Sequence, residues 1–193
     1  MKIKIFKFKK VTSTNDVAIK LIKKKNKTVG CVHASEQTKG RGTYGKKWIS
    51  NKGNLFVSFF FPIKKNIPHF KDFIIINSFI VSRVLKNIYN IKDIKIKLPN
   101  DILIKKKKIC GILQEIITFK KKEFFIVGIG LNTQSSPFIK KYKTTNLFKE
   151  TEKNIKVQEI IKLIAAAYEN FFLNLNLKKY NKYKKKADLL ASK

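Results

Sequence analysis

Residues 94–132 read IKIKLPNDILIKKKKICGILQEIITFKKKEFFIVGIGLN. Short runs of Ile, Leu, Val and Phe alternate there with lysine-rich breaks, which is the pattern of strands joined by hairpins. The four runs are Ile94–Leu98, Asp101–Ile104, Ile109–Thr118 and Glu123–Gly130. The lysines between the second and third runs are typical of an exposed hairpin turn. This stretch therefore predicts neighbouring antiparallel strands in one sheet.

The rest of the chain supplies more strands and three helices. Apolar runs predict strands at residues 1–10, Val29–Ala34 and Asn54–Phe61. Apolar residues at helical spacing predict helices that end near Lys25, that cover Phe73–Tyr89, and that cover Val157–Leu177. Together they predict an α+β fold, with a mixed, mostly antiparallel central sheet and helices packed mainly on one side.

Length and composition bound the class of protein. The 193 residues suit one domain, which we expect over residues 1–177, followed by a lysine-rich helix or tail over 178–193. Hydrophobic residues make up 44% of the chain, enough for a folded core. No apolar run approaches the roughly 18 residues of a membrane span, and the start lacks a signal peptide's apolar stretch. The two cysteines, Cys31 and Cys110, indicate neither a disulfide framework nor a zinc site. These features favour the reducing cytoplasm.

The formal net charge of +32 raises the question of a nucleic-acid partner. The lysines, however, are spread over the whole chain and do not gather in one patch. The densest run, residues 178–186, is typical of a solvated helix or chain end. We therefore expect weak, salt-sensitive binding to nucleic acid but no specific nucleic-acid partner.

A glycine-rich loop carries one of the two arginines of the chain. Arg41 stands in Gly40-Arg41-Gly42-Thr43-Tyr44-Gly45-Lys46-Lys47-Trp48, which also holds the single tryptophan. Glycines let a backbone approach a ligand closely, and a guanidinium grips phosphate or carboxylate oxygens in a forked manner. The loop thus favours a phosphate-bearing ligand, although glycine and lysine alone are also found in ordinary basic surface turns.

Four polar or glycine-bearing segments interrupt the apolar framework, each at the end of an expected strand or helix. They are Ser13-Thr14-Asn15, Ser35-Glu36-Gln37-Thr38 with the loop that follows, Lys97-Leu98-Pro99-Asn100-Asp101 with the later Lys108 and Gly111, and Gly130-Leu131-Asn132. Each segment is a weak signal by itself, since helix capping explains one of the polar residues in the first. Their order along one chain is a strong signal.

In that order the segments resemble the catalytic domain of biotin protein ligases, whose fold is similar to class II aminoacyl-tRNA synthetases and lipoate ligases. The resemblance covers residues 12–132. It implies a biotin–acetyl-CoA-carboxylase ligase that joins biotin and ATP as biotinyl-5′-AMP and releases pyrophosphate. The biotin then passes to a lysine of the biotin carboxyl carrier protein of acetyl-CoA carboxylase or a related carboxylase. ATP and Mg²⁺ are the cofactors that the family implies.

The resemblance also implies roles for single residues. Arg41 and Lys108 are expected to be catalytic, as cations placed where negative charge develops. The expected biotin-binding residues are Ser13, Thr14, Asn15, Gln37, Gly40, Arg41, Gly42, Lys108 and Gly111. The expected ATP and adenylate contacts are Arg41, Gly42, Thr43, Trp48, Asn100, Asp101 and Asn132. No firm metal ligand emerges, although Asp101 is a candidate for Mg²⁺.

Three departures from the family pattern change these expectations. Thr43 stands where many members carry an arginine that helps to retain the adenylate, so faster leakage of the intermediate is expected. Leu98 replaces a tryptophan before Pro99. Neither a DNA-binding domain before residue 12 nor the usual C-terminal β-barrel is recognised, so we expect a monofunctional enzyme with weaker ATP binding. The family leaves a homodimer open.

Two other functions remain open at this point. A lipoate ligase or octanoyltransferase has the same fold, but the Gly-Arg-Gly loop with Trp48 and the Pro99-Asn100-Asp101 segment favour biotin. A non-catalytic basic module that binds nucleic acid is favoured only by the net charge.

Overall fold

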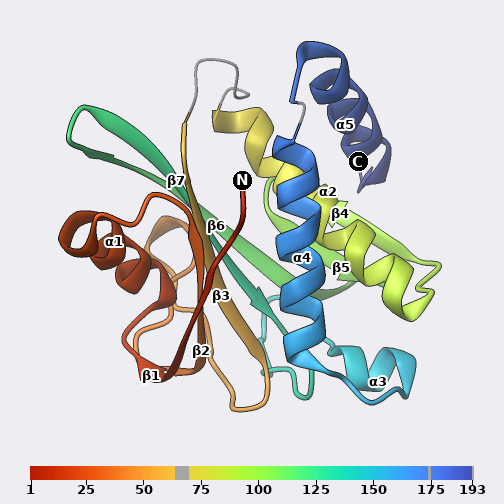
Figure 1. The fold of residues 1–193 in the computed structure, drawn as a ribbon. Helices are drawn as coiled ribbons and strands as arrows, with labels where there is room; N and C mark the ends of the chain where they lie inside the picture. The colour runs from red at the N-terminus through yellow and green to blue at the C-terminus, as the bar shows by residue number, and fades with distance from the viewer. Residues whose placement is uncertain (64–69, 174, 193) are drawn as a thin grey trace.

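Eight strands form one sheet in the order β1-β2-β3-β7-β6-β5-β4-β8 (Figure 1). The structure is a computed structural model that describes residues 1–63, 70–173 and 175–192. The strands are β1 (Ile5–Val11), β2 (Gly30–Gln37), β3 (Leu55–Pro62), β4 (Ile94–Lys97), β5 (Asp101–Ile104), β6 (Lys107–Phe119), β7 (Lys122–Leu131) and β8 (Ala191–Ser192). The helices are α1 (Thr14–Lys25), α2 (Phe70–Tyr89), α3 (Leu147–Thr151), α4 (Val157–Phe172) and α5 (Leu177–Leu190), and a short 3₁₀ turn, η1, covers Thr43–Gly45.

The sheet is mixed and mostly antiparallel, as the sequence predicts. Among the strands that the structure describes, the β1–β2 and β4–β8 pairs are parallel and the others are antiparallel. The first pair is parallel because α1 carries the chain from the end of β1 back to the start of β2. The β6–β7 hairpin is the longest pairing, running from Cys110 opposite Leu131 to Phe119 opposite Lys122. The neighbouring antiparallel strands predicted in residues 94–132 are confirmed, because β4–β5, β5–β6 and β6–β7 all pair in this way.

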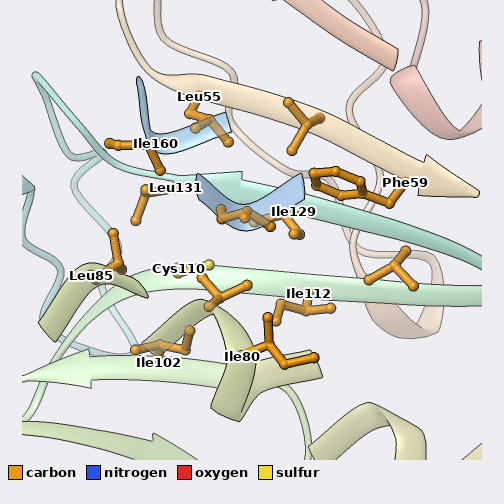
Figure 2. Packing of buried hydrophobic residues seen from close by; sticks show 14 of the residues in the cluster. Leu55, Phe59, Ile80, Leu85, Ile102, Cys110, Ile112, Ile129, Leu131 and Ile160 are labelled. Atoms are coloured by element: carbon orange, nitrogen blue, oxygen red, sulfur yellow. The ribbon is translucent and has the colours of Figure 1, made fainter. Parts of the chain in front are cut away.

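The main core lies between the sheet and the helices α2, α4 and α5, which Figure 1 shows grouped on one side. Figure 2 shows Leu55, Phe59, Ile112, Ile129 and Ile160 packed together within this core. Full burial of each such side chain contributes about 1.5–3 kcal/mol to the free energy of folding. Helix α1 packs on the opposite face with a smaller cluster around Ala18, Ile22 and Phe60. The prediction that helices cover mainly one face is confirmed, with α1 as the exception.

Side chains alternate along a strand, so the residues between these core positions face the side of α1. On β3, β6 and β7 they include Ser58, Gly111, Gly128 and Gly130, which pair across neighbouring strands: Ser58 with Gly128, and Gly111 with Gly130. Small residues on three adjacent strands leave a shallow depression in this face. The candidate site lies there.

The C-terminal part differs from the sequence prediction of one helix over Val157–Leu177. Helix α4 ends at Phe172, and α5 begins at Leu177 with Asn176 as its N-cap, whose side chain accepts from the backbone N–H of Lys179 at 2.8 Å. An asparagine cap favours a new helix start over continuation, which explains the break; residue 174 lies outside the described residues. The lysine-rich run belongs to α5, which buries Ala187 and packs on α2 and β4. Helix α3 was not predicted.

None of the described helices is long and apolar enough to cross a membrane.

Candidate active site

A pocket of about 100 Å³ opens between the start of α1, the loop of residues 40–48 and the glycine-bearing ends of β6 and β7. Most of the residues predicted from the sequence line it: Ser13, Thr14, Asn15, Gln37, Arg41, Gly42, Thr43, Trp48, Asn100, Asp101, Lys108 and Gly111. Segments up to about a hundred positions apart in the sequence therefore meet at one place. Gly40 and Asn132, which the sequence also predicts as ligand contacts, are not part of its lining.

Neutral hydrogen-bonding groups form one end of the pocket. Gln37 Oε1 accepts from the backbone N–H of Thr14 at 2.8 Å, and Gln37 Nε2 donates to Ser50 Oγ at 3.1 Å. The hydroxyl of Ser58 lies 2.7 Å from Oγ1 of Thr14 and donates to Oδ1 of Asn15 at 2.5 Å. These contacts hold the polar side chains in place, because every one of them restricts a rotamer that would otherwise turn freely.

Ser13 keeps a free hydroxyl at this end. It occupies the N-cap position of α1, yet its side chain makes no capping hydrogen bond. The residue is only 2% exposed and lines the pocket. Within the described part of the chain, its hydroxyl has no hydrogen-bond partner, so it is available to a ligand.

Arg41 links the loop to two carboxylates. Its Nη1 and Nη2 donate to Oε1 and Oε2 of Glu115 at 2.9 and 3.0 Å, and Nη2 also donates to Oδ1 of Asp16 at 2.8 Å. Burial alone lowers the pKa of Arg41, but the hydrogen bonds and charges of Glu115 and Asp16 outweigh it and raise the pKa. The guanidinium is thus fixed over the sheet between α1 and β6.

Trp48 lies flat on the glycine-bearing strands. A Cβ atom built on Gly130 would be 2.3 Å from Cε2 of Trp48, and one on Gly111 would be 2.6 Å from its Cζ3. Only glycine leaves room for the indole at these two positions. The Nε1 atom is buried and has no partner among the described residues. Backbone bonds from Trp48 N–H to Gly40 O (2.9 Å) and from Gly42 N–H to Lys46 O (2.7 Å) close the loop on itself.

Cations form the other end of the pocket. The Nζ atom of Lys108 lies 2.7 Å from Oδ1 of Asp101, and it is within 5.5 Å of the Trp48 ring centroid and 5.3 Å of the Tyr142 centroid. The neighbouring Lys105 and Lys107 instead reach Glu150, outside the pocket. Lys108 is therefore the lysine of this run that turns into the pocket, as the sequence predicts, and the exposed Lys46 and Lys47 add further positive charge to the lining.

The arrangement does not suit a metal ion held by the protein. The carboxylate of Asp101 is paired with the ammonium of Lys108. In the ranges that the structure describes, no group of three His, Cys, Asp or Glu residues is placed to hold a metal. Mg²⁺ is commonly bound through substrate phosphates in addition to one or two carboxylates, so the role of Asp101 toward Mg²⁺ stays a prediction.

Asn100 and Asn132 support the site from behind. Asn100 Nδ2 donates to the carbonyl of Ile112 at 2.8 Å, and Ile112 N–H donates back to the Asn100 carbonyl at 3.0 Å. Asn132 Nδ2 donates to the carbonyl of Thr145 at 3.0 Å, while its Oδ1 is buried without a partner among the described residues. The predicted contact of Asn132 with a nucleotide stays a prediction.

Four residues near the site were missed from the sequence. Ser58 is the single polar residue in the strand LFVSFFFP, and Glu115 lies beside Gln114 between apolar residues of β6; each is a signal that could have been used. Asp16 directly follows the Ser-Thr-Asn segment. Tyr142 lies in the loop between β7 and α3 and carries no signal in the sequence that would have marked it.

Comparison with known families gives a match to the biotin/lipoate A/B protein ligase family over residues 6–132. Among curated proteins, the chain is 29% identical to the bifunctional ligase/repressor BirA of Escherichia coli over 125 residues, or 63% of this chain and 38% of that protein. It is 31% identical to biotin–protein ligase 2 of Arabidopsis thaliana over 160 residues, or 75% of this chain and 46% of that protein. The matches thus span less than half the length of these two relatives.

Solved structures of biotin protein ligases have a similar fold. The biotin protein ligase of Aquifex aeolicus in complex with biotin and ATP superimposes with a TM-score of 0.73 at 28% identity, covering 94% of this chain and 72% of that one. The ligase of Leishmania major in complex with biotinyl-5-AMP gives a TM-score of 0.83 at 24% identity, covering 98% and 81%. At that identity the second comparison concerns the fold alone.

Proposed function

Because the chain belongs to the biotin/lipoate A/B protein ligase family, we propose that it is an ATP-dependent biotin protein ligase. In this proposal it activates biotin as biotinyl-5′-AMP and transfers biotin to a lysine of a biotin carboxyl carrier domain. The observation that carries the proposal is the polarity of the pocket. Neutral amides and hydroxyls form one end, and cations form the other.

This polarity matches the chemistry of biotin. The ureido ring offers one carbonyl and two N–H groups, which neutral partners such as Ser13, Asn15 and Gln37 suit better than charges do. An apolar chain joins this ring to a carboxylate. The indole of Trp48 lies between the two ends of the pocket and offers an apolar surface to that chain. The carboxylate would then lie near Lys108.

In the first step, an oxygen of the biotin carboxylate attacks the α-phosphorus of ATP, and the bond to the pyrophosphate leaving group breaks. Negative charge grows on the phosphoryl oxygens, where the ammonium of Lys108 stabilises it. Arg41 orders the loop of residues 40–48 through its hydrogen bonds to Glu115 and Asp16. In the second step, the acceptor lysine amine attacks the activated carbonyl carbon and AMP leaves. The loop of residues 40–48 would cover the adenylate between the two steps and exclude water.

Several further points belong to this proposal. We infer that residues 1–177 carry the activity and that α5 is part of the same unit, since it packs on α2 and β4. The acceptor is the carrier domain of a biotin-dependent carboxylase, and the place of action is the cytoplasm. Weak nonspecific binding of nucleic acid would follow from the net charge of +32 without being the function.

The test is an adenylation and transfer assay on the purified chain. With ATP labelled in its α-phosphate, we expect biotin-dependent formation of biotinyl-adenylate and of pyrophosphate. Adding a carrier domain should then yield biotinylated carrier. A parallel reaction with lipoic acid in place of biotin tests for lipoate ligase activity. Adenylate formation with lipoic acid but not with biotin would contradict the proposal. A chain that forms no adenylate with either acid would favour the non-catalytic alternative.

A further inference from the structure

Glu115 receives three hydrogen bonds from two separate parts of the site. Its Oε2 accepts from Nδ2 of Asn15 at 2.6 Å and from Nη2 of Arg41 at 3.0 Å, while its Oε1 accepts from Nη1 of Arg41 at 2.9 Å. Its side chain is 26% exposed, on the face of β6 that carries the pocket. One carboxylate thus joins the neutral end of the pocket to the loop that carries Arg41.

The chemistry of these contacts decides how the amide of Asn15 is oriented. The hydroxyl of Ser58 donates to Oδ1 of Asn15. Because a hydroxyl can also accept, Ser58 could bond equally to the NH₂ end of the amide and does not fix its orientation. An ionised carboxylate only accepts, so the NH₂ end of the amide has to face Glu115. Glu115 therefore determines which end of the Asn15 amide donates and which accepts.

The amide has no room to move away from this place. Asn15 is 2% exposed, and a Cβ atom on Gly128 beneath it would be 2.4 Å from Oδ1. The side chain can exchange its donor and acceptor ends by a half-turn, but it stays in the lining of the pocket. Exchange of the two ends would reverse the hydrogen-bonding pattern that a ligand meets.

We propose that Glu115 is a positioning residue that makes the pocket prefer a ligand ring with a carbonyl group over a ring with a hydrogen-bond donor at the same place. It holds Asn15 so that the second N–H of the amide remains for a carbonyl oxygen in the pocket. The inference rests on the proposed function, because the ring with that carbonyl is the ureido ring of biotin. Through Arg41, the same carboxylate fixes the loop relative to this amide.

The substitution Glu115→Gln reverses the pattern with little change of shape. With the Gln oxygen in the place of Oε1, the side chain still accepts from Nη1 of Arg41, and its NH₂ group takes the place of Oε2 and faces Asn15. The bond from Nη2 of Arg41 to that position is lost. Asn15 turns its Oδ1 toward that NH₂ group, and Ser58 accepts from Nδ2 instead. The pocket then presents a lone pair where the parent presents an N–H. The lone pair on Asn15 Oδ1 would repel a ring carbonyl, so a ligand with that carbonyl should bind more weakly. A ligand whose ring donates a hydrogen bond at this place should bind more tightly.

The probes are biotin and 2-iminobiotin, in which a protonated imine replaces the ring carbonyl and donates hydrogen bonds. Affinities for both are measured by calorimetry on the full chain. The parent should prefer biotin, and E115Q should shift the ratio of the two affinities toward 2-iminobiotin by at least about tenfold, the effect of about one hydrogen bond. E115D keeps an acceptor-only group and should keep the parent's preference.

Ser58→Ala is the matched control. It removes a hydrogen bond from the same amide but leaves the NH₂ end facing Glu115. Both ligands should therefore weaken by the same factor, with the ratio unchanged. The double variant N15D/E115Q restores the contact with donor and acceptor exchanged, which preserves folding if E115Q alone is unstable. It should also favour 2-iminobiotin, because Asp presents only acceptors.

Two results would overturn the inference: a parent-like ratio in E115Q and in N15D/E115Q, or equal weakening of both ligands in both variants. The second result is what a merely structural role of Glu115 would produce. Failure of the proposed function looks different, because then the parent itself would bind no biotin.

Discussion

The ammonium of Lys108 lies 2.7 Å from the carboxylate of Asp101, across the hairpin that joins β5 to β6. The backbone of Lys108 is also fixed, because its N–H donates to the Lys143 carbonyl at 2.9 Å and its carbonyl accepts from Thr145 N–H at 3.0 Å. The position of this lysine is thus set from both ends. A cation held in place before the reaction lowers the barrier more than a mobile one does.

The first prediction concerns Lys108 and Asp101. Lys108→Ala should lower the rate of adenylate formation by about 10²–10³-fold, the usual cost of one lost stabilising group. Asp101→Asn keeps the lysine but loosens its position, so we expect a smaller loss of about 10–100-fold. Pyrophosphate exchange measures both. Lys106→Ala, in the same turn but exposed, is the control and should retain full activity; equal losses in K106A and K108A would contradict the assignment.

The second prediction uses the two arginines of the chain as a matched pair. Arg41→Lys keeps the charge but loses the fork that bonds to both oxygens of Glu115, so adenylation should fall by about tenfold or more. The free energy of unfolding should change by less than about 1 kcal/mol, because partly exposed ion pairs contribute little. Arg83→Lys should change neither activity nor stability. A large loss of stability in R41K would show that Arg41 acts on the fold.

The third prediction concerns the place of Trp48 on the sheet. In Gly130→Ala, the new Cβ atom would be 2.3 Å from the indole, and β7 lies between two paired strands that resist movement. The indole must therefore leave its place. Trp48 is the only tryptophan, so its fluorescence emission should shift to longer wavelength and become more accessible to acrylamide. Gly42→Ala, where the nearest atom is 3.4 Å away, should leave the emission unchanged. Unchanged emission in G130A would contradict this placement.

Much of the fold could be predicted because the strands are strongly apolar and their breaks are rich in lysine. Asp101 was recognised because its segment interrupts that pattern at the end of a strand, whereas Lys108 was singled out within a run of lysines by its spacing to Asp101 and Gly111. The join between α4 and α5 was missed, since Leu173, Leu175 and Leu177 keep the chain apolar beyond α4, although their spacing of two is not helical. There the capping preference of Asn176 prevails over periodicity.

The network behind the pocket could not be predicted for a different reason. A polar residue within a strand faces either the core or the other side of the sheet, and the register of the neighbouring strands decides what it meets. Ser58 reaches Asn15 because β3 pairs with β7 so that Ser58 lies opposite Gly128, which leaves space for the amide. Glu115 meets Arg41 only after the loop folds back over β6.

The fourth prediction concerns Thr43, which lines the pocket at the position where the resemblance to biotin protein ligases implies an arginine. A threonine adds no charge beside the phosphate, so the parent should release biotinyl-adenylate quickly. Thr43→Arg should slow this release by about 10–100-fold, the effect of one charge-assisted hydrogen bond. Release is followed by chasing labelled adenylate with unlabelled ligand. Thr43→Gln adds length without charge and serves as the control; slow release from the parent would contradict the expectation.

The fifth prediction concerns the pH dependence of stability and the residue His33 on β2. The residue is 7% exposed, and its Nδ1 lies 3.4 Å from Nε2 of Gln158. Burial, with a further contribution from the charge of Lys7, lowers the pKa of His33 below its ordinary value of 6.5. Between that lowered pKa and 6.5, the unfolded chain binds more protons at this residue than the folded chain does. The contribution of His33 to stability is therefore present above pH 6.5 and decreases as the pH falls through this window.

Urea unfolding at several pH values between about 5 and 7.5 measures this effect. In the parent, the free energy of unfolding should rise with pH, by at most about 1.4 kcal/mol per pH unit for one proton. His33→Gln keeps a neutral polar side chain beside Gln158 and should remove this part of the slope. The second histidine, His69, is present in both proteins, so its titration cancels in the comparison. Equal slopes in the two proteins would mean that His33 is protonated as readily in the folded chain as in the unfolded one.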